Sequence, residues 1–241
     1  MNDHFEAEHR SSYAEALGAL CKSGAPFMVG GAFAVWHYTG LWRNTHDIDV
    51  YVTRNNVACA AEALKSAGFA DLGEQAPGDD QWIYHSGKGE LVVDVIWRFA
   101  NLINWVKDDW FERASAGEFL ALKLKFLPIE ELIWIKTFVI NRHRCDWPDI
   151  MHLAQAQCRR IDWNRLLGLL GENWLLLAGL IDVFDWQCPD SMGCVPEAVR
   201  EEMARRRIYY RRHPPAKVNR EHLLDPWLHT RADGYAIRRD E

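Results

Sequence analysis

Long apolar runs are scarce in this 241-residue sequence. The most apolar segment, Trp174 to Phe184, is interrupted by Asp182. It is also shorter than the roughly 20 residues that a membrane-spanning helix needs, so we expect a buried helix there. The N-terminus shows no charged-then-apolar leader. Both observations favour a cytoplasmic location.

Closely spaced cysteines are also lacking. None of the six forms a C-x-x-C pair, so the sequence gives no support for a zinc knuckle or a thioredoxin-like motif. We expect no disulfide framework, which favours a reducing compartment. The six cysteines are Cys21, Cys59, Cys145, Cys158, Cys188 and Cys194.

A surplus of positive charge is missing, because the net charge is −6. This excludes a protein that coats nucleic acid by neutralising phosphates non-specifically. One segment differs: eight Lys or Arg and only two Glu lie between Arg200 and Arg220. Its centre, Arg205–Arg212, is interleaved with tyrosines and is a candidate surface for RNA or another acidic acceptor. A solvated helix face is the alternative, and we prefer it narrowly.

The residue pattern predicts an α+β fold with a small mixed β-sheet flanked by helices, followed by a helical C-terminal half. We expect a catalytic core over residues 1–127, a helical domain over 128–194, and a basic helix with a C-terminal tail over 195–241. Strands are predicted over 27–29, 47–53, 81–85, 90–97 and 120–127. Residues 101–118 are predicted to be irregular.

Two aspartates in the segment Asp47–Thr53 require an explanation. Side chains alternate along a strand, so Asp47 and Asp49 project from one face while Ile48 and Val50 project from the other. Two like charges on one face of an apolar strand repel each other and lose hydration unless a cation lies between them. The pattern therefore predicts a metal site.

Two adjacent glycines follow the predicted strand at 27–29. Gly30 and Gly31 allow the backbone to approach a ligand without a Cβ in the way. The helix predicted after them directs its first N–H groups toward the same place, which suits phosphate. A simple tight turn is the alternative for this pair on its own.

Asp94 is a third anomalous carboxylate, in the apolar run LVVDVIW. Such a run is typical of a strand that is buried on both faces, where an unpaired carboxylate is strongly destabilising. An ion pair with Arg98 or Arg43 is the alternative for a lone aspartate. Because Asp47 and Asp49 already predict a metal site, we assign Asp94 to the same site.

In this order, the Gly30-Gly31 turn, the string from Arg43 to Val50 (RNTHDIDV) and the strand with Asp94 resemble the DNA-polymerase-β-like nucleotidyltransferase superfamily. The resemblance implies one or two Mg²⁺ ions held by Asp47, Asp49 and Asp94, and a nucleoside triphosphate such as ATP as substrate. It also implies that Asp94 accepts a proton from the acceptor hydroxyl. By the same resemblance, Gly30 and Gly31 would cradle the β- and γ-phosphates and Lys136 would offset charge on the triphosphate. Arg43 and Thr45 would position either the phosphates or the Asp47 loop.

The string KTFVINRHRCDWPDIMHL, which begins at Lys136, resembles a motif of the abortive-infection type IV toxin nucleotidyltransferases, and aminoglycoside nucleotidyltransferases are a related branch. Its motif residues are Lys136, Arg142, Asp146 and Asp149. The third acidic position departs from the toxin branch. A solvated helix face is an equal alternative for Lys136. Helix capping by Asp149, and pairing of Asp146 with Arg142 or Arg144, are the alternatives for the two aspartates.

The sequence therefore predicts an Mg²⁺-dependent nucleotidyltransferase that moves an NMP from an NTP to a hydroxyl and releases pyrophosphate. The acceptor is a small molecule, RNA or a protein. A non-catalytic nucleotide-binding or partner-binding module on the same fold is the competing hypothesis. A toxin is a narrower version of the enzyme hypothesis.

Overall fold

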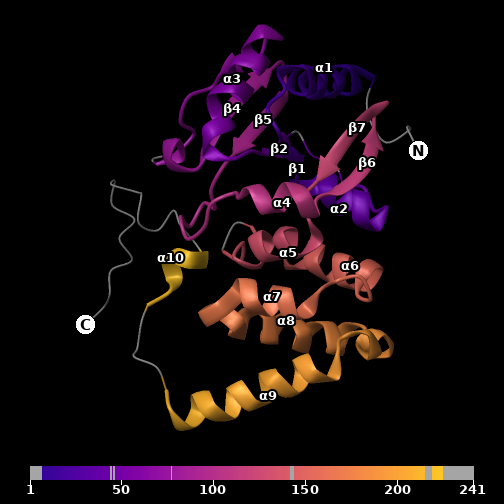
Figure 1. The fold of residues 1–241 in the computed structure, drawn as a ribbon, viewed down its shortest axis with the longest axis vertical. Coiled ribbons are helices and arrows are strands. Elements are labelled where there is room, and N and C mark those ends of the chain that lie inside the picture. The colour runs from indigo at the N-terminus through magenta and orange to yellow at the C-terminus, as the bar shows by residue number, and fades with distance from the viewer. Residues whose placement is uncertain are drawn as a thin grey trace. The chain divides into compact units, whose positions relative to one another are not determined.

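The structure is a computed structural model that describes residues 7–43, 45, 47–76, 78–141, 144–214 and 219–224. The chain divides into two compact units (Figure 1). Among the described residues, the first unit ends at Pro128 and the second begins at Ile129. This division lies one residue after the predicted end of the catalytic core. The described residues from 195 to 214 and from 219 to 224, predicted to form a separate segment, belong to the second unit.

The first unit is built on a seven-stranded mixed sheet in the order β3-β4-β5-β2-β1-β7-β6. Strand β2 runs parallel to β5, and β1 runs parallel to β7. The other neighbouring strands are antiparallel. The strands are β1 (Met28–Val29), β2 (Asp47–Tyr51), β3 (Ala70–Asp71), β4 (Ile83–Lys88), β5 (Leu91–Ile96), β6 (Ser115–Phe119) and β7 (Leu122–Phe126).

Helices cover one face of this sheet. Helices α1 and α3 pack against each other and both contact β5 (Figure 1). The side chains of Ile48, Val50, Val93 and Val95 are fully buried, so β2 and β5 place their apolar residues in the core. The helical segments of this unit are α1 (Ala7–Ser23), α2 (Gly31–Thr39), η1 (Arg54–Asn56), α3 (Val57–Ser66), η2 (Asp79–Gln81) and α4 (Asp108–Arg113).

Strand β5 differs from the prediction in one respect. Its apolar run predicts burial on both faces, but its burial alternates, and Val92 and Asp94 are only half-buried. The alternation is that of a sheet with one face on the core and the other toward solvent. Asp94 therefore does not incur the full cost of burying a carboxylate.

The described part of the second unit is helical, as predicted. Its segments are α5 (Ile129–Thr137), α6 (Trp147–Gln157), α7 (Trp163–Leu170), η3 (Gly171–Asn173), α8 (Trp174–Gln187), η4 (Pro189–Cys194), α9 (Glu197–Arg212) and α10 (Glu221–Leu224). Residues Trp163–Gln187 are long and apolar enough to cross a membrane by length and composition alone. In the structure this stretch is divided at Gly171, and 44% of its most apolar window is buried.

One covalent bond is not expected from the sequence. Cys158 and Cys194 form a disulfide that links the end of α6 to the end of η4. The expectation of no disulfide is therefore wrong for this pair. Disulfides are rare in reducing compartments, so the bond removes the cysteine-based support for a cytoplasmic location.

Candidate active site

The predicted glycines and carboxylates meet in one row across the sheet. Asp49 on β2 is in register with Asp94 on the parallel strand β5. Gly30, directly after β1, donates its N–H to the carbonyl oxygen of Asp49 over 2.9 Å. On the other side of Asp94, the antiparallel strand β4 places His85 directly opposite. The row is therefore Gly30, Asp49, Asp94 and His85.

Both glycines are closely packed against side chains of β2. A Cβ on Gly31 would lie 1.7 Å from Oδ2 of Asp49, and a Cβ on Gly30 would lie 2.2 Å from the ring of Tyr51. Gly31 also has φ +51°, in the left-handed region that favours glycine. It is the first residue of α2, so the N-terminus of that helix lies against the Asp49 carboxylate. The two glycines are needed here for close approach as well as for a turn.

Asp47 lies two residues before Asp49 on β2 and is held by the preceding loop. Thr45 donates its hydroxyl hydrogen to Oδ1 of Asp47. The hydroxyl of Tyr13, on α1, donates to the backbone oxygen of Thr45 over 3.0 Å. Burial and the charge of Asp47 raise the pKa of Tyr13 to about 12, so it remains a hydrogen-bond donor at neutral pH. Thr45 therefore orients Asp47.

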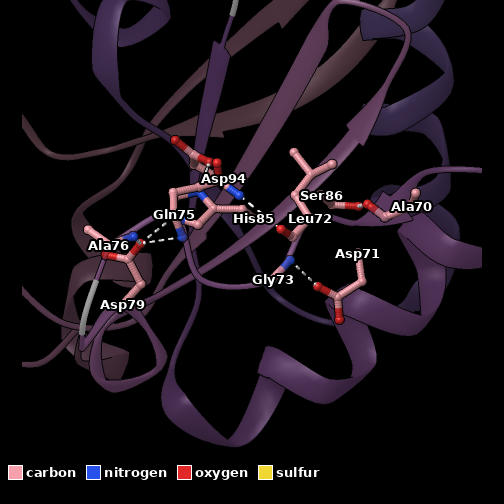
Figure 2. Close-up of polar contacts among 10 residues, drawn as sticks. All are labelled: Ala70, Asp71, Leu72, Gly73, Gln75, Ala76, Asp79, His85, Ser86 and Asp94. Atoms are coloured by element: carbon pink, nitrogen blue, oxygen red, sulfur yellow. Dashed lines mark hydrogen bonds and ion pairs between the residues drawn. The ribbon is translucent and has the colours of Figure 1, made fainter.

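Asp94 is held by a histidine that the sequence did not single out. Figure 2 shows the ring of His85 between two carboxylates. Its Nδ1 lies 2.7 Å from Oδ1 of Asp94, and its Nε2 lies 3.2 Å from Oδ2 of Asp79. The alternative partners predicted for Asp94 were Arg98 and Arg43, and the structure gives it His85 instead.

Asp79 is itself almost completely buried, with 1% exposure. Its Oδ2 accepts the backbone N–H groups of Gln75 and Ala76, at 2.9 and 2.7 Å. The backbone shortly before η2 is therefore hydrogen-bonded to this carboxylate (Figure 2). Because both ring nitrogens of His85 face carboxylate oxygens, both donate when the ring is protonated. The hydrogen bond with Asp94 raises the pKa of His85, although burial partly opposes the rise.

The donor set of this face suits a hard divalent cation. Asp47, Asp49 and Asp94 project from one face, and carboxylate oxygens are the ligands that Mg²⁺ prefers. Neighbouring strands lie about 4.8 Å apart, which brings Asp49 and Asp94 within reach of a shared ion. No group of three His, Cys, Asp or Glu side chains among the described residues converges on a metal position. Asp47 and Asp94 instead have Thr45 and His85 as partners.

Lys136 belongs to the second unit and to a different cluster. It is 2% exposed, so a solvated helix face is wrong. Its Nζ lies 2.7 Å from carboxylate oxygens of both Asp146 and Asp149. Arg144 also contacts Asp146, over 2.8 Å. An ammonium held by two carboxylates fits an ion-pair network, so we do not include Lys136 in the phosphate site.

The charge of Asp146 is held by these cations. Burial raises the pKa of Asp146, but Arg144 and Lys136 outweigh that effect, and the net pKa is below its usual range. The predicted pairing of Asp146 with Arg144 is confirmed. Arg142, the other predicted partner, lies outside the described residues.

The remaining predicted residues lie on the surface or outside the described residues. Arg43 is exposed in the segment after α2. His46, expected to point away from the carboxylates, is outside the described residues. On α9, Arg205 and Arg206 both contact Glu202. These ion pairs fit the solvated helix face, and RNA binding by Arg205–Arg212 stays a prediction.

Comparison with known families decides the class of protein. Residues 9–167 match the family described as nucleotidyl transferase of unknown function (DUF2204). The chain belongs to this family. The predicted nucleotidyltransferase identity is thereby confirmed. A search of curated proteins found no match.

Several solved structures are similar to this chain in fold. The antibiotic-resistance factor ANT(2'')-Ia shares 14% identity, with a TM-score of 0.41 over 87% of this chain and 100% of that one. The lincosamide antibiotic adenylyltransferase LnuA shares 16% identity, with a TM-score of 0.44 over 62% and 98% of the two chains. JHP933 from Helicobacter pylori shares 14% identity, with a TM-score of 0.43 over 75% and 79%. At these scores, none of them bears on the acceptor.

Proposed function

We propose that this nucleotidyltransferase moves an NMP from an NTP such as ATP to a hydroxyl group and releases pyrophosphate. The observation that carries the proposal is the row in which Gly30, Asp49 and Asp94 are direct neighbours across three strands. This row brings a close backbone approach next to two carboxylates on one face. Such an arrangement serves a triphosphate and the cation that accompanies it.

Asp47, Asp49 and Asp94 would hold Mg²⁺, as one or two ions. The metal supplies charge neutralisation on the phosphates and polarisation of the attacking and leaving oxygens. Thr45 keeps Asp47 in place through its hydroxyl. The role of these protein groups is to fix the carboxylates before substrate arrives, so that little reorganisation is needed during reaction.

The phosphates would bind at the N-terminus of α2. The first N–H groups of a helix have no partner within the helix and carry partial positive charge, which suits phosphate oxygens. Gly30 and Gly31 place no side chain between these groups and the ligand. Arg43, exposed in the segment after α2, remains the basic side chain predicted to contact the phosphates or the Asp47 loop.

Asp94 would act as the general base. The acceptor oxygen forms a bond to the α-phosphorus, the bond to pyrophosphate breaks, and the hydroxyl proton passes to the carboxylate of Asp94. His85 contacts one oxygen of Asp94, Oδ1. The other oxygen, Oδ2, is then the one assigned to the cation and the hydroxyl proton.

The test is transfer of label from α-labelled NTPs into RNA, protein and small hydroxylated acceptors, with pyrophosphate release measured in parallel. We expect Mg²⁺-dependent transfer by the wild-type chain and its loss in Asp47→Asn and Asp49→Asn. Glu62→Gln is a matched control, because Glu62 is a carboxylate on α3, outside the row. Equal behaviour of wild type and Asp49→Asn with every acceptor would refute catalysis at this site.

The competing hypothesis of a non-catalytic binding module predicts a different result. A module on this fold would bind nucleotide without releasing pyrophosphate in the presence of any acceptor. Growth of cells that express the chain tests the toxin alternative. Arrest that Asp49→Ala relieves would support a toxin, and normal growth would oppose it.

A further inference from the structure

Asp79 and His85 form a connected pair behind Asp94. The sequence pattern does not indicate this pair, because Asp79 lies in a Gly-, Pro- and Asp-rich segment and His85 lies near a predicted turn. In the structure, η2 holds Asp79, β4 holds His85 and β5 holds Asp94. The three side chains contact one another in sequence (Figure 2). None of the roles assigned to the active site explains why Asp79 and His85 are there.

The side chains of Asp79, His85 and Asp94 are largely buried. The side chains of His85 and Asp94 are 12% and 14% exposed, and that of Asp79 is 2% exposed. A buried carboxylate is destabilising unless it is hydrogen-bonded or paired. Oδ2 of Asp79 meets this requirement by accepting from two backbone N–H groups and by its contact with His85, whereas Oδ1 is buried with no hydrogen-bond partner among the described residues. His85 is thereby held at Nε2 by a carboxylate that is itself hydrogen-bonded to the backbone of the preceding loop.

We propose that His85, anchored by Asp79, is a positioning residue that sets the orientation of Asp94. The ring holds Oδ1 of Asp94, so Oδ2 is presented to the cation and to the acceptor hydroxyl beside Asp49. This inference rests on the proposed metal-dependent function. It adds a role for the segment from Leu72 to Gln81, which becomes coupled to the metal site through Asp79.

The same segment is attached at further points. The backbone N–H of Leu72 donates to the carbonyl of His85 over 3.0 Å. The indole N–H of Trp97, which follows β5, donates to the carbonyl of Gln81 over 3.1 Å. Both ends of the segment are therefore tied to the strands that carry His85 and Asp94. A change in the conformation of this segment would therefore reach the carboxylate of Asp94 through Asp79 and His85.

The test measures Mn²⁺ affinity of the full chain by the EPR signal of free Mn²⁺, without nucleotide and with a non-hydrolysable NTP. Loss of a group that orients a metal ligand typically weakens metal affinity about 10- to 100-fold, so we expect this for His85→Ala. Thermal unfolding of each variant is measured together with its Mn²⁺ affinity. Ser86→Ala is the control, because Ser86 is buried on the same strand and bonds the carbonyl of Ala70.

Two amide variants separate positioning from simple packing. The amide of asparagine can overlay Nδ1 of the ring and reach Asp94, whereas that of glutamine overlays Nε2 and reaches Asp79. We expect His85→Asn to recover most of the Mn²⁺ affinity and His85→Gln to recover little. The double variant Asp79→Ala/His85→Ala should bind Mn²⁺ no more weakly than His85→Ala, because the two act in series.

The outcomes distinguish this inference from the proposed function. If Mn²⁺ binding does not depend on Asp49 at all, the proposed metal site itself fails. If binding depends on Asp49 but His85→Ala, or both amide variants, bind Mn²⁺ as wild type does, only the positioning role is wrong. Weakened binding by His85→Gln with recovery by His85→Asn supports the role even where His85→Ala is too unstable to purify.

Discussion

The contact between Gly31 and Asp49 gives the sharpest single-residue prediction. In Gly31→Ala the new Cβ would lie 1.7 Å from Oδ2 of Asp49, whereas ordinary contact requires about 3.5 Å. The carboxylate or the start of α2 must therefore move by about 2 Å. A misplacement of about 1 Å at a reacting centre can lower the rate about 100-fold. We expect at least that loss in nucleotidyl transfer.

The stability of Gly31→Ala is also expected to fall, for two separable reasons. Alanine in the left-handed region costs about 1 to 2 kcal/mol. Overpacking against Asp49 adds about 1 to 3 kcal/mol. Gly40→Ala isolates the first cost, because Gly40 has φ +72° and a Cβ added there would meet nothing within 4 Å. The difference between the two variants in urea unfolding then measures the contact with Asp49.

The assays are urea unfolding, Mn²⁺ binding and label transfer on wild type, Gly31→Ala and Gly40→Ala. Gly40→Ala should lose stability but keep Mn²⁺ affinity and transfer. Wild-type transfer by Gly31→Ala, together with a stability equal to that of Gly40→Ala, would show that the glycine does not support the carboxylate.

Three further predictions concern the second unit. Lys136→Ala leaves two carboxylates without their shared cation, and removal of one partner from a buried pair costs about 3 to 5 kcal/mol, measurable by urea unfolding. Cys158→Ser opens a loop of 36 residues, for which chain entropy predicts a loss of about 3 to 4 kcal/mol; an unchanged midpoint under reducing conditions would contradict it. Because the folded pKa of Asp146 is depressed, its contribution is present above the unfolded pKa of about 3.9 and is lost as the pH falls through the folded value. Asp146→Asn should therefore show a weaker loss of stability in an acid titration than wild type.

The glycines and carboxylates of the candidate site could be singled out from the sequence because each is marked by a local pattern. Alternation along β2 places Asp47 and Asp49 on one face, and the anomaly of a carboxylate in an apolar run singles out Asp94. The glycine pair is recognisable by its place after a strand. These signals need no knowledge of which strand pairs with which.

His85 was not recognised because its contact with Asp94 comes from cross-strand register. The sequence predicts a strand that ends at His85 and a turn from Ser86 to Gly89. Strand β4 instead continues to Lys88, and register alone places His85 opposite Asp94. Glycine at position 87 mimics a turn signal, although in the structure it makes room for the side chain of Leu72.

Strand β6 was missed for a related reason. Its hairpin with β7 turns at Leu120 and Ala121, which have φ of 51° and 62°. Turns with two positive φ values normally carry Asn, Asp or Gly, and neither residue here gives that signal. The disulfide of Cys158 with Cys194 was also beyond prediction, because connectivity among spaced cysteines cannot be deduced from sequence.

The parallel register of β2 and β5 has a consequence for how the protein avoids an inactive fold. A slip of β5 by one residue would turn Asp94 toward the core and bring Val93 to the carboxylate face. That slipped form would bury a charge under α1 and α3 and would expose valines to water, and both changes oppose it strongly. The alternation that makes the core stable thus also selects the register that assembles the site. The free energy of folding therefore disfavours a molecule in which Asp94 is misplaced, even when no substrate is present.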